Sequence, residues 1–336
     1  SAVEGLTVVQ RGMEPLVVPI ALALLLFLFF LQRRGTTKVG ALFAPVLIVS
    51  PPEHTPAVRT LLLDEPGATH VSVLPGIAIE PAGDVVEADV TREAVDAVLC
   101  GLRELGIDHS GGITLEALDT ALSDAADAAE EAVPGDPADA VIWDELVSRT
   151  GEDSRLTVSF LAFLTIACLL AAIGAITNSP VTVVGAMVLG PEFGPLAAVA
   201  IGVVLRRRDL VARGAIALGV GFPLAMAVTA VATLAFDATD LLVSANLDQL
   251  DQVDFIYEVG PFSLIVALLA GAAGMLALTS AKSASLVGVF ISVTTVPAAA
   301  FAAAALVEGR WSQAAGSALQ LVVNMVGIVL AAAVVL

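Results

Sequence analysis

The sequence predicts an α-helical polytopic membrane protein. We expect a six-span core built as a 3+3 inverted repeat, one additional N-terminal span and a small α+β ferredoxin-like cytoplasmic domain. Three observations favour this fold class. The 336 residues are 57% hydrophobic with a mean hydropathy of +0.93, values typical of membrane proteins. Seven stretches are long and apolar enough to cross a bilayer. The net charge of −19 is concentrated between the first two of these stretches.

The charge divides the chain into two parts. Residues 46–153 contain 23 acidic and 4 basic side chains, and the rest of the chain contains 11 of each sign. The acidic part is therefore aqueous, and its charge argues against nucleic acid or anionic lipid as its partner. The simplest interpretation of this charge is a solvated, repulsive surface. The two cysteines, Cys100 and Cys168, lie one in each part, so no disulfide framework is expected.

The first apolar stretch covers residues 15–31 and is followed by Arg33, Arg34 and Lys38. A signal peptide has the reverse order of basic and apolar residues, so we predict a transmembrane helix with a cytoplasmic C-terminal end. We assign residues 1–44 to this N-terminal segment. The sequences SAVEGL and MEPLVVPIALALLLFLFFLQRRGTTKVGALFAPV resemble a piece of a KUP-type potassium uptake transporter over residues 1–49. We expect a gene fusion or another join of two sequences near residues 43–50, and the resemblance does not extend to the ion-binding helices of that family.

The acidic part begins with a predicted ferredoxin-like domain at residues 45–116. Short strands are expected at 46–49, 69–74, 84–90 and 113–115, and helices at 56–63 and from the capping residue Thr91 to Gly106. The order βαββαβ is typical of a ferredoxin-like sandwich, which implies no activity by itself. Residues 117–154 are acidic and predicted to form a helical linker. The three histidines lie in separate turns without ligand spacing, so neither a metal site nor a cofactor is expected.

The membrane domain is predicted to cover residues 155–336. Its apolar spans are expected at about 156–176, 180–205, 210–236, 260–279, 284–307 and 314–336. If the spans alternate, ten basic residues fall on one side: Arg33, Arg34, Lys38, Arg149, Arg155, Arg206, Arg207, Arg208, Arg213 and Lys282. The positive-inside rule then places the ferredoxin-like domain in the cytoplasm and the N-terminus and the acidic loop 237–258 outside. We predict a multi-pass protein of the cell (inner) membrane.

The two halves of this membrane domain resemble each other at an offset of 102 residues. The shift places Thr177 on Thr279 and Pro195 on Pro297, and the spans and loops stay in register. Because each half has an odd number of spans, the halves would have opposite orientations. Inverted repeats with a proline-interrupted helix at equivalent positions are typical of secondary transporters, whose sites lie near the middle of the bilayer. The alternative is a pair of unrelated hydrophobic halves.

The second membrane span contains the sequence Gly190-Pro191-Glu192-Phe193-Gly194-Pro195 at its centre. Both prolines lack an N–H and clash with the preceding turn, so the helix is expected to break or kink. Glu192 is the only acidic residue inside any predicted span, and leaving it ionised and unpaired there costs several kcal/mol. Three interpretations stay open: binding of a cation or proton, a protonated side chain that caps the second half-helix, and a position near the membrane interface.

The second half of the membrane domain contains matching polar groups. Ser292, Thr294 and Thr295 precede Pro297, while Gln320 and Asn324 share one face of the last span. We predict that the site for a substrate or ion consists of Glu192, Gly190, Pro191, Gly194, Pro195, Ser292, Thr294, Thr295, Pro297 and Asn324. The alternative is that these polar residues only hydrogen-bond neighbouring helices. The run from Arg206 to Arg208 is interpreted as a topology anchor, with binding of anionic lipid head groups as the functional alternative.

The sequence SPVTVVGAMVLGPEFGPLAAV and the acidic helical segment before it resemble a known family. It is the uncharacterised hydrophobic domain called domain of unknown function 389, in its form with a ferredoxin-like N-terminal domain. The resemblance covers residues 46–336, and the segment 185–195, the Pro297 region and Asn324 match its recurring signatures. It implies the architecture described above and no settled activity.

These observations predict a secondary transporter or channel for a small solute or ion. Glu192 would be the binding or coupling carboxylate, and the ferredoxin-like domain would regulate or oligomerise the protein. Membrane lipids, a small solute or cation and further copies of the chain are the expected partners, with no nucleic acid. The alternative is a membrane scaffold or sensor whose ferredoxin-like domain binds a ligand or partner. No GxSxG, P-loop or metal-ligand pattern occurs, so an enzyme is not expected.

Overall fold

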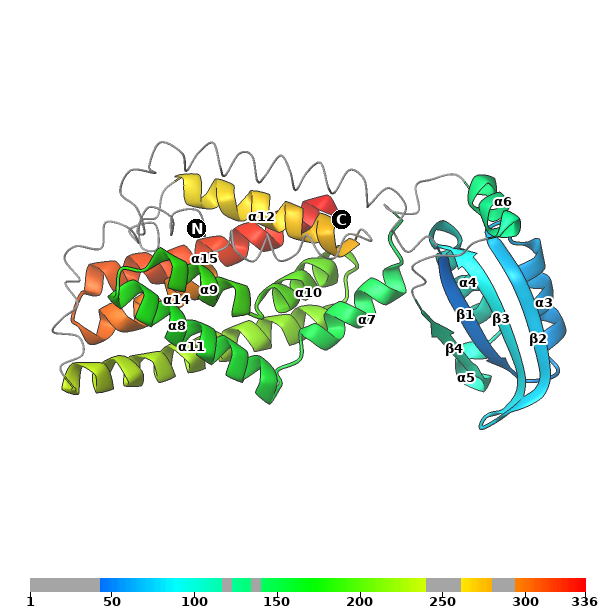
Figure 1. Ribbon diagram of the computed structural model, residues 1–336, viewed down its shortest axis with the longest axis horizontal. Helices are drawn as coiled ribbons and strands as arrows, with labels where there is room; N and C mark the ends of the chain where they lie inside the picture. Colours follow the sequence, from blue (N-terminus) through cyan, green and yellow to red (C-terminus); the bar gives the residue numbers. More distant parts are fainter. Residues whose placement is uncertain (1–42, 117–122, 134–139, 240–260, 280–293) are drawn as a thin grey trace, which may run out of the picture. The chain divides into compact units, whose positions relative to one another are not determined.

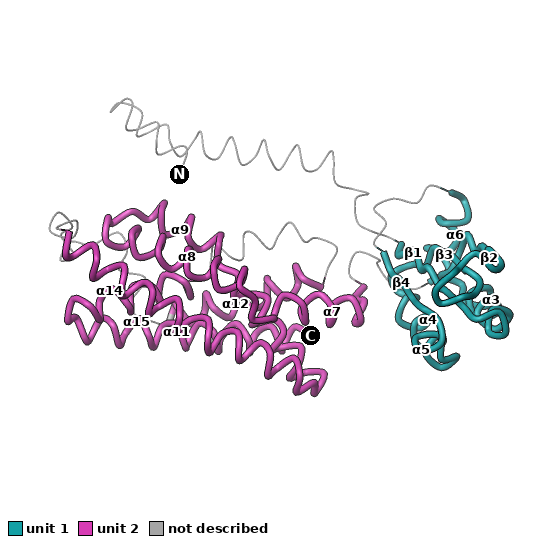
Figure 2. Tube along the Cα trace, turned by 90° about the horizontal axis from the view of Figure 1, so that it is seen from below, with its two compact units in different colours: residues 1–138 teal, residues 139–336 magenta. Residues whose placement is uncertain are grey.

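The computed structural model describes residues 43–116, 123–133, 140–239, 261–279 and 294–336 (Figure 1). The chain divides into two compact units, residues 1–138 and residues 139–336 (Figure 2). The first unit combines a small sheet with helices, and the second is helical. The predicted N-terminal span and the predicted site residue Ser292 lie outside the described residues.

The first unit is built on a four-stranded antiparallel sheet with the strand order β2-β3-β1-β4 (Figure 1). The register pairs Ile48 of β1 with Val86 of β3 and with Ile113 of β4. Its elements are, in chain order, β1 (Phe43–Ser50), α3 (Thr55–Asp64), β2 (Ala68–Ile79), β3 (Ala82–Thr91), α4 (Arg92–Glu104), α5 (Ile107–Ser110) and β4 (Gly112–Leu115). The observed βαββαβ order, apart from the short α5, is the order that the sequence predicted.

The core of this unit lies between the sheet and the helices α3 and α4. Side chains alternate along a strand, so Ile48 and Val86 are fully buried while the neighbouring Leu47 is 37% exposed. Leu102 of α4 is also fully buried, as its helical spacing predicted. Thr91 occupies the position before α4, but its side chain makes no capping hydrogen bond, contrary to the expected capping role.

The predicted linker at residues 117–154 is divided between the two units. Helix α6 (Asp124–Ala132) packs against β2 and β3, and its Ala126 and Ala129 share a small apolar cluster with Phe43. The hydroxyl of Ser123 accepts a hydrogen bond from the amide of Ala126 and thereby caps α6. Helix α7 (Trp143–Asp153) packs against α10 (Phe193–Val204) and belongs to the second unit.

The second unit has the composition of a membrane protein. Four of its described helices are long and apolar enough to cross a membrane, or up to five if a bent pair counts as one span. Large apolar side chains point outward, among them Val158, Val231 and Phe262, which are 85%, 66% and 80% exposed. The helices are α8 (Val158–Ile176), α9 (Pro180–Leu189), α10, α11 (Arg208–Ala238), α12 (Pro261–Thr279), α14 (Thr295–Val307) and α15 (Trp311–Val335). Residues 284–293 of the predicted fifth span lie outside the described residues.

Glycines allow the helices of this unit to approach closely. A Cβ atom on Gly271 of α12 would lie 2.5 Å from the carbonyl oxygen of Ile328 on α15. A Cβ atom on Gly214 of α11 would lie 2.5 Å from the carbonyl oxygen of Pro195 on α10. Small residues at such crossings are the usual means of packing helices where lipid replaces water, because dispersion contacts must supply the association energy.

Candidate functional site

The apolar helix that the sequence predicted at residues 180–205 is broken at its centre. Helix α9 ends at Leu189 and α10 begins at Phe193, with an angle of 52° between them. Pro195 is the third residue of α10, where its missing N–H removes no helical hydrogen bond. The amide of Leu196 makes the first bond of this helix, to the carbonyl of Glu192 at 3.2 Å. The break is therefore at Gly190 and Pro191, and Pro195 lies in the first turn of a helix where a second kink was expected.

Glu192 lies at this break and is only 5% exposed. Its Oε1 accepts a hydrogen bond of 2.5 Å from the hydroxyl of Thr295, which is 103 residues away in sequence. Its Oε2 is buried, and the described residues offer it no hydrogen-bond partner. Glu192 occupies the position before α10, but its side chain makes no capping hydrogen bond there, which argues against the interpretation as a helix cap.

The start of α10 thus meets the start of α14, whose first residue is Thr295. Free N–H groups give the N-terminus of a helix a partial positive charge, which stabilises a nearby carboxylate. Two such termini lie next to Glu192, and the one hydrogen bond described for its side chain comes from a neutral hydroxyl. The arrangement can hold a carboxylate whose second oxygen is available to a proton or a cation.

The two glycines of the predicted site have different surroundings. A Cβ atom on Gly190 would overlap Oε2 of Glu192 and lie 2.8 Å from Cγ2 of Val296, so the glycine leaves room for the carboxylate. A Cβ atom on Gly194 would instead lie 2.7 Å from Cβ of Asp153 on α7. Gly190 therefore shapes the site, whereas Gly194 allows α7 to pack against α10.

A second polar contact joins α14 to α15 beside this site. The amide of Asn324 donates a hydrogen bond of 2.8 Å to the hydroxyl of Thr294, the residue before α14. Ser317 and Gln320 lie on the same face of α15 as Asn324, at helical spacings of three and four residues. Their Oγ and Oε1 atoms are buried without a hydrogen-bond partner among the described residues. Sequence reasoning left Ser317 and Gln320 out of the site, although this spacing indicates a common polar face.

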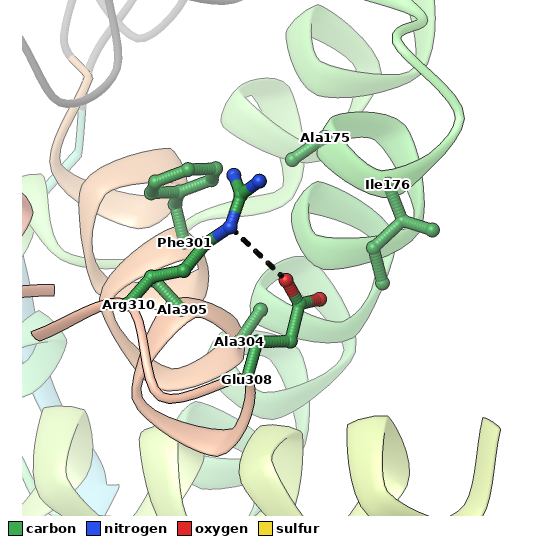
Figure 3. A pocket seen from close by; sticks show the side chains of 7 residues that line it. All are labelled: Ala175, Ile176, Phe301, Ala304, Ala305, Glu308 and Arg310. Carbon is green, nitrogen blue, oxygen red and sulfur yellow. Dashed lines mark ion pairs between the residues drawn. The ribbon is translucent and has the colours of Figure 1, made fainter. Parts of the chain in front are cut away.

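A small pocket lies at the other end of α14 (Figure 3). Glu308 and Arg310 are among its lining residues, with 3.7 Å between Oε2 and Nε, and Arg310 also donates to Gln313 at 3.1 Å. The remaining lining residues are Ala175, Ile176, Phe301, Ala304 and Ala305. Because α14 has 13 residues and is about 20 Å long, this pocket is separate from the contact at Thr295.

One further polar cluster, in the first unit, has the connectivity of a hydrolytic triad. Nδ1 of His70 lies 2.7 Å from Asp89, and Nε2 lies 2.8 Å from the hydroxyl of Ser123. The Ser123 oxygen already accepts the capping hydrogen bond of α6, and the side chain of His70 is 42% exposed. A catalytic nucleophile lies in a site sheltered from water, and this cluster is exposed to it. The observed role of this cluster is to hold α6 against β2 and β3.

Comparison with known families confirms the two resemblances that the sequence predicted. Residues 187–330 match the family model described as "Domain of unknown function (DUF389)". Residues 1–50 match the "K+ potassium transporter integral membrane domain". The first match includes α10, α14 and Asn324, and therefore Glu192 and both of its neighbouring polar contacts.

Curated relatives match short parts of the chain. A "Probable potassium transport system protein Kup" from Erythrobacter litoralis is 67% identical over 49 residues, which are 15% of this chain and 8% of that protein. The protein of the same name from Cupriavidus metallidurans is 37% identical over 117 residues, 32% of this chain and 17% of that protein. The chain therefore spans less than a fifth of the length of these relatives. No solved structure matches.

Proposed function

We propose that the membrane unit is a secondary transporter or channel for a small cation, a proton or another small solute, with Glu192 as the binding carboxylate. One observation carries this proposal: Glu192 is buried at a helix break, Thr295 holds one of its oxygens, and the other has no described partner. Buried polar atoms in proteins are normally hydrogen-bonded, and ionisable groups inside membrane segments are costly. A buried carboxylate oxygen without a described partner favours a role in binding.

We also propose that the unit is a 3+3 inverted repeat. An offset of about 102 residues relates α8 to α12, α10 to α14 and α11 to α15, with starts that agree to within three residues. The packing supports the same relation, since α10 contacts both α11 and α15, and α14 contacts both α15 and α11. At this offset Glu192 and Thr294, the residues before the two half-helices, are equivalent, and the site lies at the junction of the repeats.

The turns after the two half-helices are alike, as a repeat requires, although α8 ends in the same type of turn at residues 177–179. After α10, the amides of Leu205, Arg206 and Arg207 donate to the carbonyls of residues 201, 203 and 202. After α14, the amides of Glu308, Gly309 and Arg310 donate to residues 304, 306 and 305, which is the same pattern shifted by 103. The central residue of each turn is left-handed, with φ of 56° at Arg206 and 72° at Gly309.

The other parts of the chain have proposed roles in support of transport. The sheet order β2-β3-β1-β4 supports a ferredoxin-like sandwich in the first unit, which we propose regulates or oligomerises the protein. The basic residues at one end of the spans support a protein of the inner membrane whose first unit lies in the cytoplasm. The Kup relatives are named as potassium transport proteins, so K⁺ is the first cation to test. We propose no enzymatic activity.

Flux measurements on the full chain in proteoliposomes test this function. Gradients of K⁺, Na⁺ and H⁺ should drive measurable flux through the parent protein. Glu192→Gln should reduce that flux about 10- to 100-fold, because a ligand bond to a charged group contributes about 1.5–3 kcal/mol. The matched control is Asp209→Asn, which removes an exposed carboxylate and should leave the flux unchanged.

The outcome separates the proposal from its alternative. Equal flux in Glu192→Gln and the parent at every pH would remove the carboxylate from the mechanism. A folded parent protein that carries none of these ions, or any small solute tested, would instead favour a membrane scaffold or sensor.

A further inference from the structure

We propose that the groove between α10 and α11 binds an anionic phospholipid, with Arg206 and Arg208 holding the phosphate of its head group. The groove is lined by these two arginines and by five small or apolar residues: Gly202, Val203, Val211, Ala212 and Ala215. This site is separate from Glu192 and does not depend on the proposed transport function.

The apolar part of the groove suits an acyl chain. A Cβ atom on Gly202 would lie 2.9 Å from the backbone nitrogen of Val211, so α10 and α11 touch at the floor of the groove. Val203 on one wall is 55% exposed, and Ala212 and Ala215 on the other wall are also exposed. Both helices belong to candidate membrane spans, so the open side of the groove faces hydrocarbon when the protein is in a bilayer.

The three consecutive arginines beside the groove differ in their ion pairs. Arg207 makes a bidentate ion pair with Asp209, with distances of 2.7 and 3.2 Å. Arg207 is not part of the groove, whereas Arg206 and Arg208 on either side of it are. Guanidinium groups bind phosphate through paired N–H donors, and basic clusters at the ends of membrane helices bind anionic head groups.

The backbone at Arg206 supports a role for its side chain. Its φ of 56° is left-handed, a conformation that costs free energy in an arginine and that glycine adopts freely. Gly309 occupies the same position in the matching turn after α14, with φ of 72°. In that turn the charges pair internally, between Glu308 and Arg310 (Figure 3). An arginine at the strained position, beside a second arginine, indicates an external anion.

A soluble anion would need only the two arginines, whereas a lipid also needs the groove. We commit to the lipid because the apolar lining begins directly below Arg206 and Arg208 and continues for more than one turn of α11, from Val211 to Ala215. A head group at the arginines therefore places its acyl chains along the groove.

Native mass spectrometry of the detergent-purified full chain tests the charged part of the site. Phosphatidylglycerol and phosphatidylcholine are titrated separately, and the parent should retain the anionic lipid more strongly. Arg206→Gly combined with Arg208→Gln should lower retention of phosphatidylglycerol about tenfold. Arg206→Gly also removes the backbone strain, so the Tm of this variant should not fall. Arg155→Gln combined with Arg213→Gln removes two exposed charges outside the groove and should have little effect.

A second pair of variants tests the apolar part. Ala212→Trp fills the groove without changing charge and should also reduce retention, whereas Val220→Trp, on an exposed site of the same helix, should not. Equal losses in both double-arginine variants would show general attraction to charge and overturn the proposal. Unchanged retention in Arg206→Gly/Arg208→Gln, or in Ala212→Trp, would overturn it as well.

Discussion

Replacing Gly271 by valine is expected to destabilise the membrane unit by about 3 kcal/mol or more, the upper end of the usual cost of overpacking. A Cβ atom at this position would lie 2.5 Å from the carbonyl oxygen, 2.7 Å from Cα and 3.0 Å from the carbonyl carbon of Ile328. These are backbone atoms of α15, which cannot rotate aside as a side chain could. The helices α12 and α15 must therefore separate along their contact.

The free energy of unfolding in mixed micelles, followed by circular dichroism, measures this effect. Gly219→Val is the matched control, because Gly219 is exposed on α11 and no described atom lies within 4 Å of its added Cβ. The same substitution should then be nearly neutral, because valine has a somewhat higher helix propensity than the glycine it replaces. Equal destabilisation by the two variants would contradict the close approach of α12 and α15.

Replacing Thr295 by valine is expected to destabilise the protein by about 1–3 kcal/mol, the cost of leaving a buried polar partner unsatisfied. Valine has the shape of threonine without the hydroxyl, so it removes the hydrogen bond to Oε1 of Glu192 and little else. Both carboxylate oxygens of Glu192 would then lack a described partner. The cost should fall sharply when Glu192 is also replaced by methionine, because removing both partners of a buried bond can be nearly neutral.

A double-mutant cycle of Thr295→Val and Glu192→Met measures this coupling through the free energies of unfolding. Thr229→Val provides the control: Thr229 is fully buried too, but its hydroxyl donates to the backbone carbonyl of Ala225 in its own helix. That carbonyl keeps its helical bond, so the control should cost less. Additive effects in the cycle, with Thr295→Val no worse than the control, would show that the contact with Glu192 contributes nothing to stability.

Much of the first unit could be predicted from local pattern. The alternation that buries Ile48 and Val86, and the helical spacing that buries Leu102, are properties of neighbouring residues. Thr91 shows the limit of this reasoning, since a threonine before a helix usually caps it, yet here its hydroxyl makes no such bond. That hydroxyl is instead buried without a hydrogen-bond partner among the described residues, which depends on packing that the local pattern does not contain.

The candidate site could be predicted only in part, because contacts between distant residues also depend on packing. Glu192, Thr294 and Thr295 could be named because polar residues near prolines are unusual in apolar spans, and Asn324 because it shares a helix face with Gln320. The structure brings these four predicted side chains into two hydrogen-bonded pairs. Whether they bind a substrate stays a prediction. The roles of Gly190 and Gly194 could not be separated in advance, because each depends on which atoms lie above the missing Cβ.

The sequence by itself determined where the described apolar helices of the second unit form, where one of them breaks and which acid lies at the break. These follow from hydropathy, from the missing N–H of proline and from the cost of burying a carboxylate, all of which are local properties. Only the tertiary structure decided that the carboxylate of Glu192 meets the first residue of a half-helix 103 residues later. That contact depends on how α10 and α14 pack between α11 and α15, and packing is set by the shapes of whole helix surfaces.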